Sequence, residues 1–413
     1  MKIINAVDVP DSFFANEVIQ GVDVKSIIVE VREKGDIAVK EFTKKFDSIE
    51  LENIEVTKEE KEQAYKKVDK RVLSSLKKAA KNIEAFAKKQ YRSFKSFETK
   101  IAGNKIGQRI IPIQKVGCYV PGGRYPLPSS ALMSVIPAKV AGVEEIIVCS
   151  PKISAITIVA ADIAGADKIY RIGGVQAIAA MTYGTQSIPK VDKIVGPGNK
   201  YVTAAKKEVY GDVGIDFLAG PSEVFIIADE TAVPKIIAAD LLAQLEHDPS
   251  ARADLVTTSQ KIAEEVKVEV ERQIELLTTK EVAKQALANG YIIIVKKMEE
   301  AIAFANKRAP EHLELCVKSP EQWILQLKNY GSLFIGMYSA EVFGDYCSGT
   351  NHALPTNGAA RYTGGLSVKE FVKVVTYQEM TKQGAQRLIP IAATLAAIEG
   401  LDAHKKAAEI RKE

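Results

Sequence analysis

The sequence predicts an α/β protein with two doubly wound, Rossmann-like domains of mostly parallel sheet, followed by a small helical C-terminal segment. From Ile106 onward, short runs of β-branched residues alternate with helical segments rich in small residues. Glycine or proline follows most of these runs, and the alternation is typical of βαβ units. The 413 residues, 46% of them hydrophobic, are enough to bury more than one core.

The first hundred residues read as amphipathic helices over residues 22–45 and 58–89, joined by a polar connection over 47–52. Residues 58–100 are rich in lysine, but apolar side chains recur among the lysines at helical spacing. We therefore interpret the lysines as the solvated face of a helix and not as a nucleic-acid site. The apolar positions are Val72, Leu76, Ala79, Ile83 and Phe86.

Two sets of βαβ units follow these helices. The first set contains the segments KVGCYVPGG, EEIIVCS, KIYRIGG and VDKIVGPGN as strands with their turns, and the second contains EVFIIADE, ADLVTTS, YIIIVKK and GSLFIG. We expect residues 1–115 together with 223–365 to form one α/β domain and residues 116–222 to form the other. Residues 366–413 form the helical segment, in which Gly400 ends one helix and Asp402 caps the last, over 403–411.

Composition excludes several classes of function. Lys and Arg (56) barely exceed Asp and Glu (52), so the net charge of +4 does not indicate a nucleic-acid partner. Acidic residues arrive by Asp8, and the apolar stretch over 388–398 is interrupted by Pro390, well short of the ~20 residues of a membrane span. The four cysteines form no CxxC pair. We expect a soluble protein of the reducing cytoplasm.

Histidine is scarce, with four in the chain, and each stands beside other residues of functional type. In LLAQLEHDPS, Gln244 and His247 are three apart on an expected helix and share one face, so both can reach a single ion. Taken alone, a pair with this spacing is more often part of an ordinary exposed surface than a metal site.

The segment APEHLEL places Glu311 and His312 directly after a proline, at the start of an element. A carboxylate and an imidazole can both transfer protons, and removing a hydride from an alcohol carbon requires a proton to leave its oxygen. The alternative is an acidic residue placed at a helix start by the helix dipole.

The loop GDYCSGTNHALPT carries Asp345 and His352 and has the polar, glycine-punctuated composition of a site loop. In the tail, Glu399 and His404 lie on opposite sides of Gly400 and converge only if the chain turns there. His404 would complete a set of two nitrogen and two oxygen donors that suits zinc and excludes a thiolate site. The other three members are Gln244, His247 and Asp345.

Three glycine turns at expected strand ends could approach a pyrophosphate through their backbone amides. The full GxGxxG fingerprint is absent because Tyr201 occupies the third glycine position, so the pattern alone does not establish NAD. The turns are Val120-Pro121-Gly122-Gly123, Ile172-Gly173-Gly174 and Val195-Gly196-Pro197-Gly198-Asn199.

Together these motifs resemble the histidinol dehydrogenase family. Eight motifs in the same order carry the resemblance, which covers nearly the whole chain from VREKGDIAVKEFTKKFD onward. They are VGCYVPGGRYPLPSSALM, GGVQAIAAMTYGT, VDKIVGPGNKYVTAAK, AGPSEVFIIAD, DLLAQLEHDP, APEHLEL, GDYCSGTNHALPT and EGLDAHKKA.

The resemblance implies a site for each ligand. One zinc ion per subunit would be bound by Gln244, His247, Asp345 and His404. NAD would contact Tyr119, Gln176 and Asn199, and L-histidinol would contact Ser222, Glu399 and the neighbourhood of His352, besides the zinc ligands and His312.

The resemblance also implies two hydride transfers to two NAD molecules at one site. His312 would take the alcohol proton in the first, and Glu311 would activate water on the bound aldehyde for the second. Because the tail is exchanged between subunits in this family, Glu399 and His404 would complete the partner's site. The homodimer is then the catalytic unit.

Two other functions fit parts of the sequence. In a zinc hydrolase or lyase, Glu311 would activate water, but the nucleotide-like half would have no role. A metabolite-binding module would suit two lobes with a cleft but leaves the acid, base and metal-type residues unexplained. Cys118 and Cys347 lie inside motifs and could suggest a thiohemiacetal at the aldehyde step, but we interpret both as packing residues.

Overall fold

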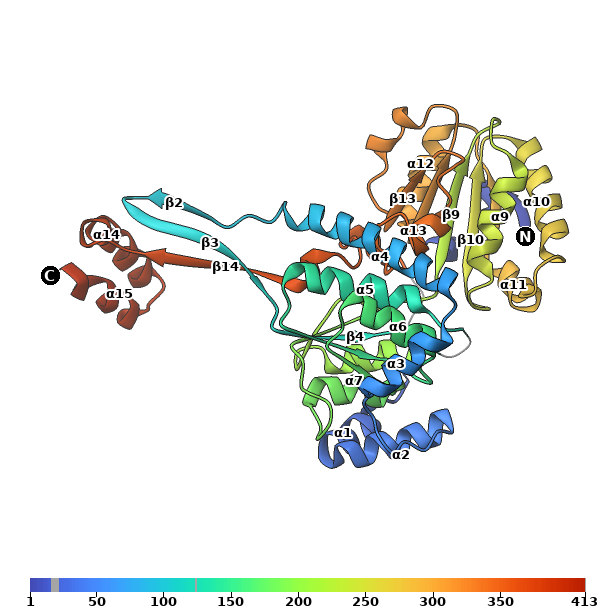
Figure 1. Ribbon diagram of the computed structural model, residues 1–413. Helices are drawn as coiled ribbons and strands as arrows, with labels where there is room; N and C mark the ends of the chain where they lie inside the picture. The colour runs from blue at the N-terminus through green and yellow to red at the C-terminus, as the bar shows by residue number, and fades with distance from the viewer. Residues whose placement is uncertain (16–21, 123–124, 413) are drawn as a thin grey trace.

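The computed structural model describes residues 1–15, 22–122 and 125–412. Two α/β bodies lie side by side, and an extended arm, formed by residues 97–112 and 372–379, runs from them to the C-terminal helices (Figure 1). The predicted fold class is confirmed, since both main sheets are parallel and have helices on both faces.

The first sheet has six parallel strands in the order β1-β11-β10-β9-β12-β13. Apolar clusters on its two faces pack against α9 and α10 on one side and against α12 and Phe13 on the other. The strands are β1 (Lys2–Asn5), β9 (Glu223–Ala228), β10 (Arg252–Thr257), β11 (Tyr291–Ile294), β12 (His312–Cys316) and β13 (Ser332–Ile335). The helices are α9 (Pro234–Leu245), α10 (Gln260–Ile274), α11 (Lys280–Ala286), α12 (Met298–Arg308) and α13 (Glu341–Tyr346).

The second sheet has five parallel strands in the order β6-β5-β4-β7-β8, and apolar clusters again cover both faces. The strands are β4 (Lys115–Tyr119), β5 (Glu145–Cys149), β6 (Lys168–Tyr170), β7 (Lys193–Val195) and β8 (Gly214–Ile215). The helices are α5 (Pro128–Ala141), α6 (Ala155–Ala164), α7 (Gly174–Tyr183) and α8 (Lys200–Val209).

Each of the two helices expected in the first hundred residues is divided in two. Gly35, with φ of 58°, separates α1 from α2, and Asp69 accepts a hydrogen bond from Arg71 N (2.7 Å) as the N-cap that starts α4 after α3. All four helices pack beside α5, α6 and α7, so their contacts favour grouping them with the second sheet, whereas the sequence placed them with the first. Their bounds are α1 (Lys25–Lys34), α2 (Asp36–Asp47), α3 (Lys58–Lys67) and α4 (Lys70–Tyr91).

The expectation of a purely helical tail is wrong. Residues 372–379 form a strand, β14 (Val372–Glu379), which pairs antiparallel with β3 (Asn104–Pro112), and β3 pairs with β2 (Phe97–Ile101). The run VKVVT at the start of β14 has the β-branched composition of a strand, but its partner lies more than 250 residues earlier in the chain. The tail is therefore tied to the arm by a long-range ladder.

Two helices end the tail, α14 (Lys382–Ile398) and α15 (Asp402–Glu409), and Gly400 separates them as expected. Asp402 is the first residue of α15, with Leu401 as its N-cap, and not the cap that the sequence suggested. Figure 1 shows both helices at the far end of the arm, well away from the two main sheets.

Short 3-10 helices connect these elements, and their main effect is to turn the chain between strands and helices. They are η1 (Ala6–Asp8), η2 (Asp11–Phe14), η3 (Leu287–Asn289), η4 (Pro320–Gln322), η5 (Ile324–Gln326), η6 (Ala359–Arg361), η7 (Val368–Phe371) and η8 (Ile410–Lys412). Among the residues that the structure describes, no helix combines the length and the apolar character needed to cross a membrane.

Candidate active site between the two sheets

Five of the predicted site residues meet at the amino edge of the first sheet. His312 opens β12 with Glu311 directly before it, as the proline in that segment suggested. Gln244 lies near the end of α9, His247 follows that helix, and Asp345 lies on α13.

His247 is held with one ring nitrogen free. Its Nδ1 lies 3.0 Å from Ala243 O and 3.3 Å from Gln244 O. Because carbonyl oxygens only accept, Nδ1 carries the hydrogen and donates it, which leaves the lone pair on Nε2. An exposed imidazole fixed in this tautomer is suited to binding a metal ion through Nε2.

His312 is buried and also has a fixed tautomer. Nδ1 lies 3.2 Å from Glu223 O and donates to it. Nε2 is 3.4 Å from Asp345 Oδ1 without the geometry of a hydrogen bond, and it has no hydrogen-bond partner within the described part of the chain. A buried nitrogen left in this state indicates that a ligand completes the site.

Glu311 lies beside His312 and shares its proton chemistry. Its Oε2 accepts from Glu223 N (2.9 Å) and is 3.7 Å from His312 Nδ1. Burial raises the pKa of Glu311 to about 8. Burial lowers the pKa of His312, but the carboxylates of Glu311, Asp345 and Glu341 outweigh burial and hold it above its usual value. With a pKa of about 8, Glu311 can hold and release a proton near neutral pH.

Asp345 joins the two bodies. Burial raises its pKa, but His312, His352 and His247 together lower it below its usual value, so the group is a carboxylate. His352 Nδ1 donates to Asp345 O (2.8 Å), and His352 Nε2 accepts from Ser130 Oγ (3.2 Å) at the start of α5. The segment that follows α13 and carries His352 is thus held against the second α/β body, whereas Asp345 lies on α13 and not on the loop that the sequence predicted.

The residues predicted for the nucleotide lie at the carboxyl edge of the second sheet. Tyr119 ends β4, and its hydroxyl accepts a hydrogen bond from Gly174 N (3.1 Å). Gln176 is buried in the first turn of α7, and its Oε1 has no partner among the described residues. Asn199 caps α8 by accepting from Tyr201 N and Val202 N, so its amide NH₂ alone is free to meet a ligand.

The Gly196 turn beside these residues is locked by a buried ion pair that the sequence analysis missed. Gly196 has φ of 113°, and a Cβ there would lie 2.1 Å from Tyr119 O. Lys206 Nζ donates to Gly196 O (3.0 Å) and pairs with Asp216, which accepts from Gly196 N (2.8 Å). Of the three glycine turns, Gly123 in the first lies outside the described residues.

Ser222 and the two cysteines inside motifs were also singled out in the sequence. Ser222 is half-buried and lies directly before Glu223 at the same edge as His312. Cys118 is buried in the core, which supports its role in packing, and burial raises its pKa to about 12. Cys347 is exposed, so the packing interpretation is wrong for it.

Glu399, the residue after α14, and His404 on α15 are both exposed. Figure 1 shows α14 and α15 at the far end of the arm, away from the two main sheets near which the other site residues lie. Within the described residues, no group of three or more His, Cys, Asp or Glu side chains could hold a metal ion. One chain therefore brings together Gln244, His247 and Asp345, but not the fourth predicted ligand.

The sequence analysis missed a set of buried carboxyl groups behind the site. Three of the four lie one helical turn or one strand repeat from a residue that was identified, and this spacing could have revealed them. Asp240 precedes Gln244 by four on α9, Glu341 precedes Asp345 by four on α13, and Glu314 follows His312 by two on β12. Glu223, which pairs with Arg308, opens β9.

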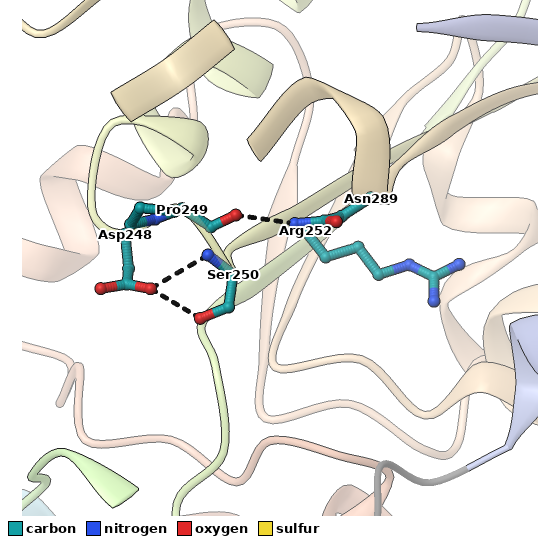
Figure 2. A pocket seen from close by; sticks show the side chains of 5 residues that line it. All are labelled: Asp248, Pro249, Ser250, Arg252 and Asn289. Carbon is teal, nitrogen blue, oxygen red and sulfur yellow. Dashed lines mark hydrogen bonds between the residues drawn. The ribbon is translucent and has the colours of Figure 1, made fainter. Parts of the chain in front are cut away.

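A hollow of about 490 Å³ lies next to the segment that follows His247 (Figure 2). The Asp248 carboxylate accepts from Ser250 N (3.0 Å) and Ser250 Oγ (2.6 Å), and Pro249 O accepts from Asn289 Nδ2 (2.9 Å). Arg252 extends away from Asp248 in Figure 2, and its Nε donates to Asp254 (2.7 Å). These contacts fix the loop after His247.

Comparisons with known proteins give one consistent result. The profile of the family described as histidinol dehydrogenase matches residues 15–412. Histidinol dehydrogenase of Methanocaldococcus jannaschii is 51% identical to this chain, covering 94% of it and 91% of the relative. That of Bacillus cereus is 48% identical, covering 94% and 92%. The crystal structure of histidinol dehydrogenase from Elizabethkingia anophelis is similar with a TM-score of 0.94 at 39% identity, covering 100% of this chain and 98% of that one.

The buried pair of Asp240 and Glu314 predicts a pH-dependent stability. Burial raises the pKa of Asp240 to about 6 and, together with the charge of Asp240, that of Glu314 to about 8. Above about pH 5 the unfolded chain loses these protons while the folded chain retains them. The two carboxyl groups therefore lower the free energy of unfolding, and this effect grows as the pH rises to about 8. Glu314→Gln should therefore raise the melting temperature at pH 8 by roughly 2–4 °C, the shift that about 1 kcal/mol produces in a domain of this size.

Thermal unfolding of wild type and variant between pH 5 and pH 8 measures this effect. Glu62→Gln, which removes an exposed carboxylate from α3, is the matched control. A difference between Glu314→Gln and wild type that stays constant across this pH range would contradict the prediction.

Proposed function

The chain belongs to the histidinol dehydrogenase family, and from this premise we propose that it oxidises L-histidinol, through the aldehyde, to L-histidine with NAD as the electron acceptor. Membership makes it an oxidoreductase of histidine biosynthesis. The observation that carries the proposal is the buried, unpartnered Nε2 of His312 beside the donor groups of Gln244, His247 and Asp345. A proton acceptor next to a metal-type donor set is what alcohol oxidation on a bound substrate requires.

The donor set fits zinc. His247 has a free Nε2, Asp345 is a carboxylate, and Gln244 contributes an amide oxygen, so all three are nitrogen or oxygen donors. His404 of the partner subunit would supply the fourth. Zinc, when bound, supplies a positive charge that holds and polarises the imidazole and amine of the substrate.

The arm supports a homodimer. Ile391, Leu395 and Ile398 on α14 follow the spacing i, i+4, i+7, and they are 57%, 56% and 77% exposed. An apolar stripe of this kind on an extended arm favours coverage by another protein surface. A second copy of the chain explains both the stripe and the distance of Glu399 and His404 from their own site, because the tail then completes the partner's site.

The carboxyl edge of the second sheet suits NAD. The unpartnered Oε1 of Gln176, the NH₂ group of Asn199 and the amino ends of α7 and α8 lie along this edge, where a pyrophosphate and ribose can be bound. NAD supplies the hydride acceptor that the side chains of the chain lack.

The side chains of the chain perform the proton transfers. In the first oxidation, His312 Nε2 receives the proton of the alcohol oxygen as hydride leaves the alcohol carbon. Throughout this step, Nδ1–H of His312 remains hydrogen-bonded to Glu223 O. In the second, Glu311 removes a proton from the water that adds to the aldehyde. Ser222, together with Glu399 of the partner subunit, would contact the remaining polar groups of the substrate.

We place the enzyme in the cytoplasm. All four cysteines are free, and three of them are buried, which suits a reducing compartment where NAD is available.

Purified protein supplied with L-histidinol and NAD should produce two NADH per histidinol consumed, measured by near-ultraviolet absorbance, and a chelator should abolish the reaction. Added zinc should restore it. A folded, metal-loaded protein that forms no NADH would instead favour a hydrolase or lyase.

Variants of the two proton-transfer residues should separate the two oxidations. His312→Asn removes the base for the alcohol and should reduce kcat by roughly 10²–10⁴-fold. Glu311→Gln leaves that base in place, so the ratio of NADH to histidinol should fall from two toward one as aldehyde accumulates. Zinc content, measured on both variants, controls for loss of the site, and an unchanged ratio in Glu311→Gln would contradict its assignment.

A further inference from the structure

Glu341 is a buried carboxyl group for which neither packing nor the proton transfers provide a role. It opens α13, and its exposed fraction is 0%. Its backbone N donates to Glu314 Oε1 (3.1 Å), which secures the start of the helix. Its Oε2 has no hydrogen-bond partner within the described residues and lies 3.9 Å from His312 Nδ1. A carboxyl group in this position is costly, since burying it forfeits hydration that its contacts only partly replace.

The other carboxyl oxygen of Glu341, Oε1, contacts the side chain of Gln244. Gln244 is 1% exposed, and its amide satisfies both neighbours in only one orientation. In that orientation Nε2 donates to Glu341 Oε1 (3.1 Å) and Oε1 accepts from Glu223 N (2.8 Å). In the reversed orientation, the amide oxygen of Gln244 would face Glu341 Oε1, and its NH₂ group would face the backbone N–H of Glu223.

Glu341 has the larger influence on the orientation of the Gln244 amide. Glu223 N also donates to Glu311 Oε2 (2.9 Å), so its hydrogen bond to Gln244 is shared and weakened. Oε1 of Glu341, in contrast, faces Gln244 and accepts from the NH₂ end of its amide, and a carboxylate in this position has no hydrogen to offer to the oxygen end.

The orientation matters because a side-chain amide can bind a metal ion through its oxygen but not through its NH₂ group. We propose that Glu341 is a positioning residue that turns the NH₂ group of Gln244 toward itself and thereby keeps the oxygen of Gln244 available as a zinc ligand. This inference rests on the zinc site of the proposed function. It adds to that site an outer group without which one ligand would be presented in the wrong orientation.

The zinc dissociation constant of the purified full-length protein tests the proposal directly, by competition with a chromophoric chelator. Glu341→Gln has nearly the same volume but offers either an oxygen or an NH₂ group to Gln244, so the selection is lost. We expect zinc to bind at least about 10-fold more weakly, as for other groups that orient metal ligands. Glu314→Gln is the matched control, because it makes the same change at a neighbouring buried carboxyl group that has no hydrogen bond to Gln244, and it should bind zinc as wild type does.

A double-mutant cycle separates orientation from charge. In Gln244→Glu both ends of the side chain are oxygen, so there is no orientation to select. Adding Glu341→Gln to this background should therefore not weaken zinc binding. This double variant exchanges the two residue types and retains the hydrogen-bonding groups of the pair.

The outcomes are distinct. Wild-type affinity in Glu341→Gln, or an equal loss of affinity with and without Gln244→Glu, would overturn the proposal while the zinc site stands. A wild-type protein that binds no zinc would overturn the zinc site and this inference together. If Glu341→Gln does not fold, Glu341→Asp replaces it, because its carboxylate is one methylene too short to reach Gln244 and should show the same loss and the same dependence on Gln244.

Discussion

Buried charge must be paired, and this constraint governs the arrangement of the site. Glu223, Glu311, Glu341 and Asp345 are buried around one point at the amino edge of the first sheet, where Arg308 and His312 lie within 4 Å of them. Removing several carboxyl groups from water costs several kcal/mol each unless opposite charge or hydrogen bonds replace the hydration. A divalent cation and the imidazole and amine of the substrate are positively charged or donate hydrogen bonds, so the site is matched to both.

The two sheets contribute opposite edges to this site. In open α/β sheets, ligands usually lie at the carboxyl ends of the strands, and the nucleotide site that we propose on the second sheet, at Tyr119 and Gly196, agrees with this rule. The first sheet instead uses the amino ends of β9 and β12. The contact between His352 and Ser130 joins that edge to the start of α5. A nucleotide on one sheet and a substrate on the other could then meet between them.

Local patterns in the sequence predicted the parallel sheets and the elements that carry Gln244, His312 and Gly196, because strand composition and glycine turns are local signals. The division of the first helices at Gly35 and Asp69 could also have been read locally. The pairing of β14 with β3, the ion pair of Lys206 with Asp216 and the contact of Glu341 with Gln244 could not, because each joins residues brought together only by the fold. For His404 the limit is greater, since the role that we propose for it depends on a second chain, which the sequence of one chain does not place.

The central claim is that each site is built from two chains. It is tested most directly by mixing two inactive variants, His247→Ala and His404→Ala, and measuring the activity of dimers shown to contain one chain of each. If the tails are exchanged, one of the two sites in such a dimer has all its ligands, and about half of the wild-type activity should return. Mixed dimers that remain as inactive as the parent variants would contradict a shared site.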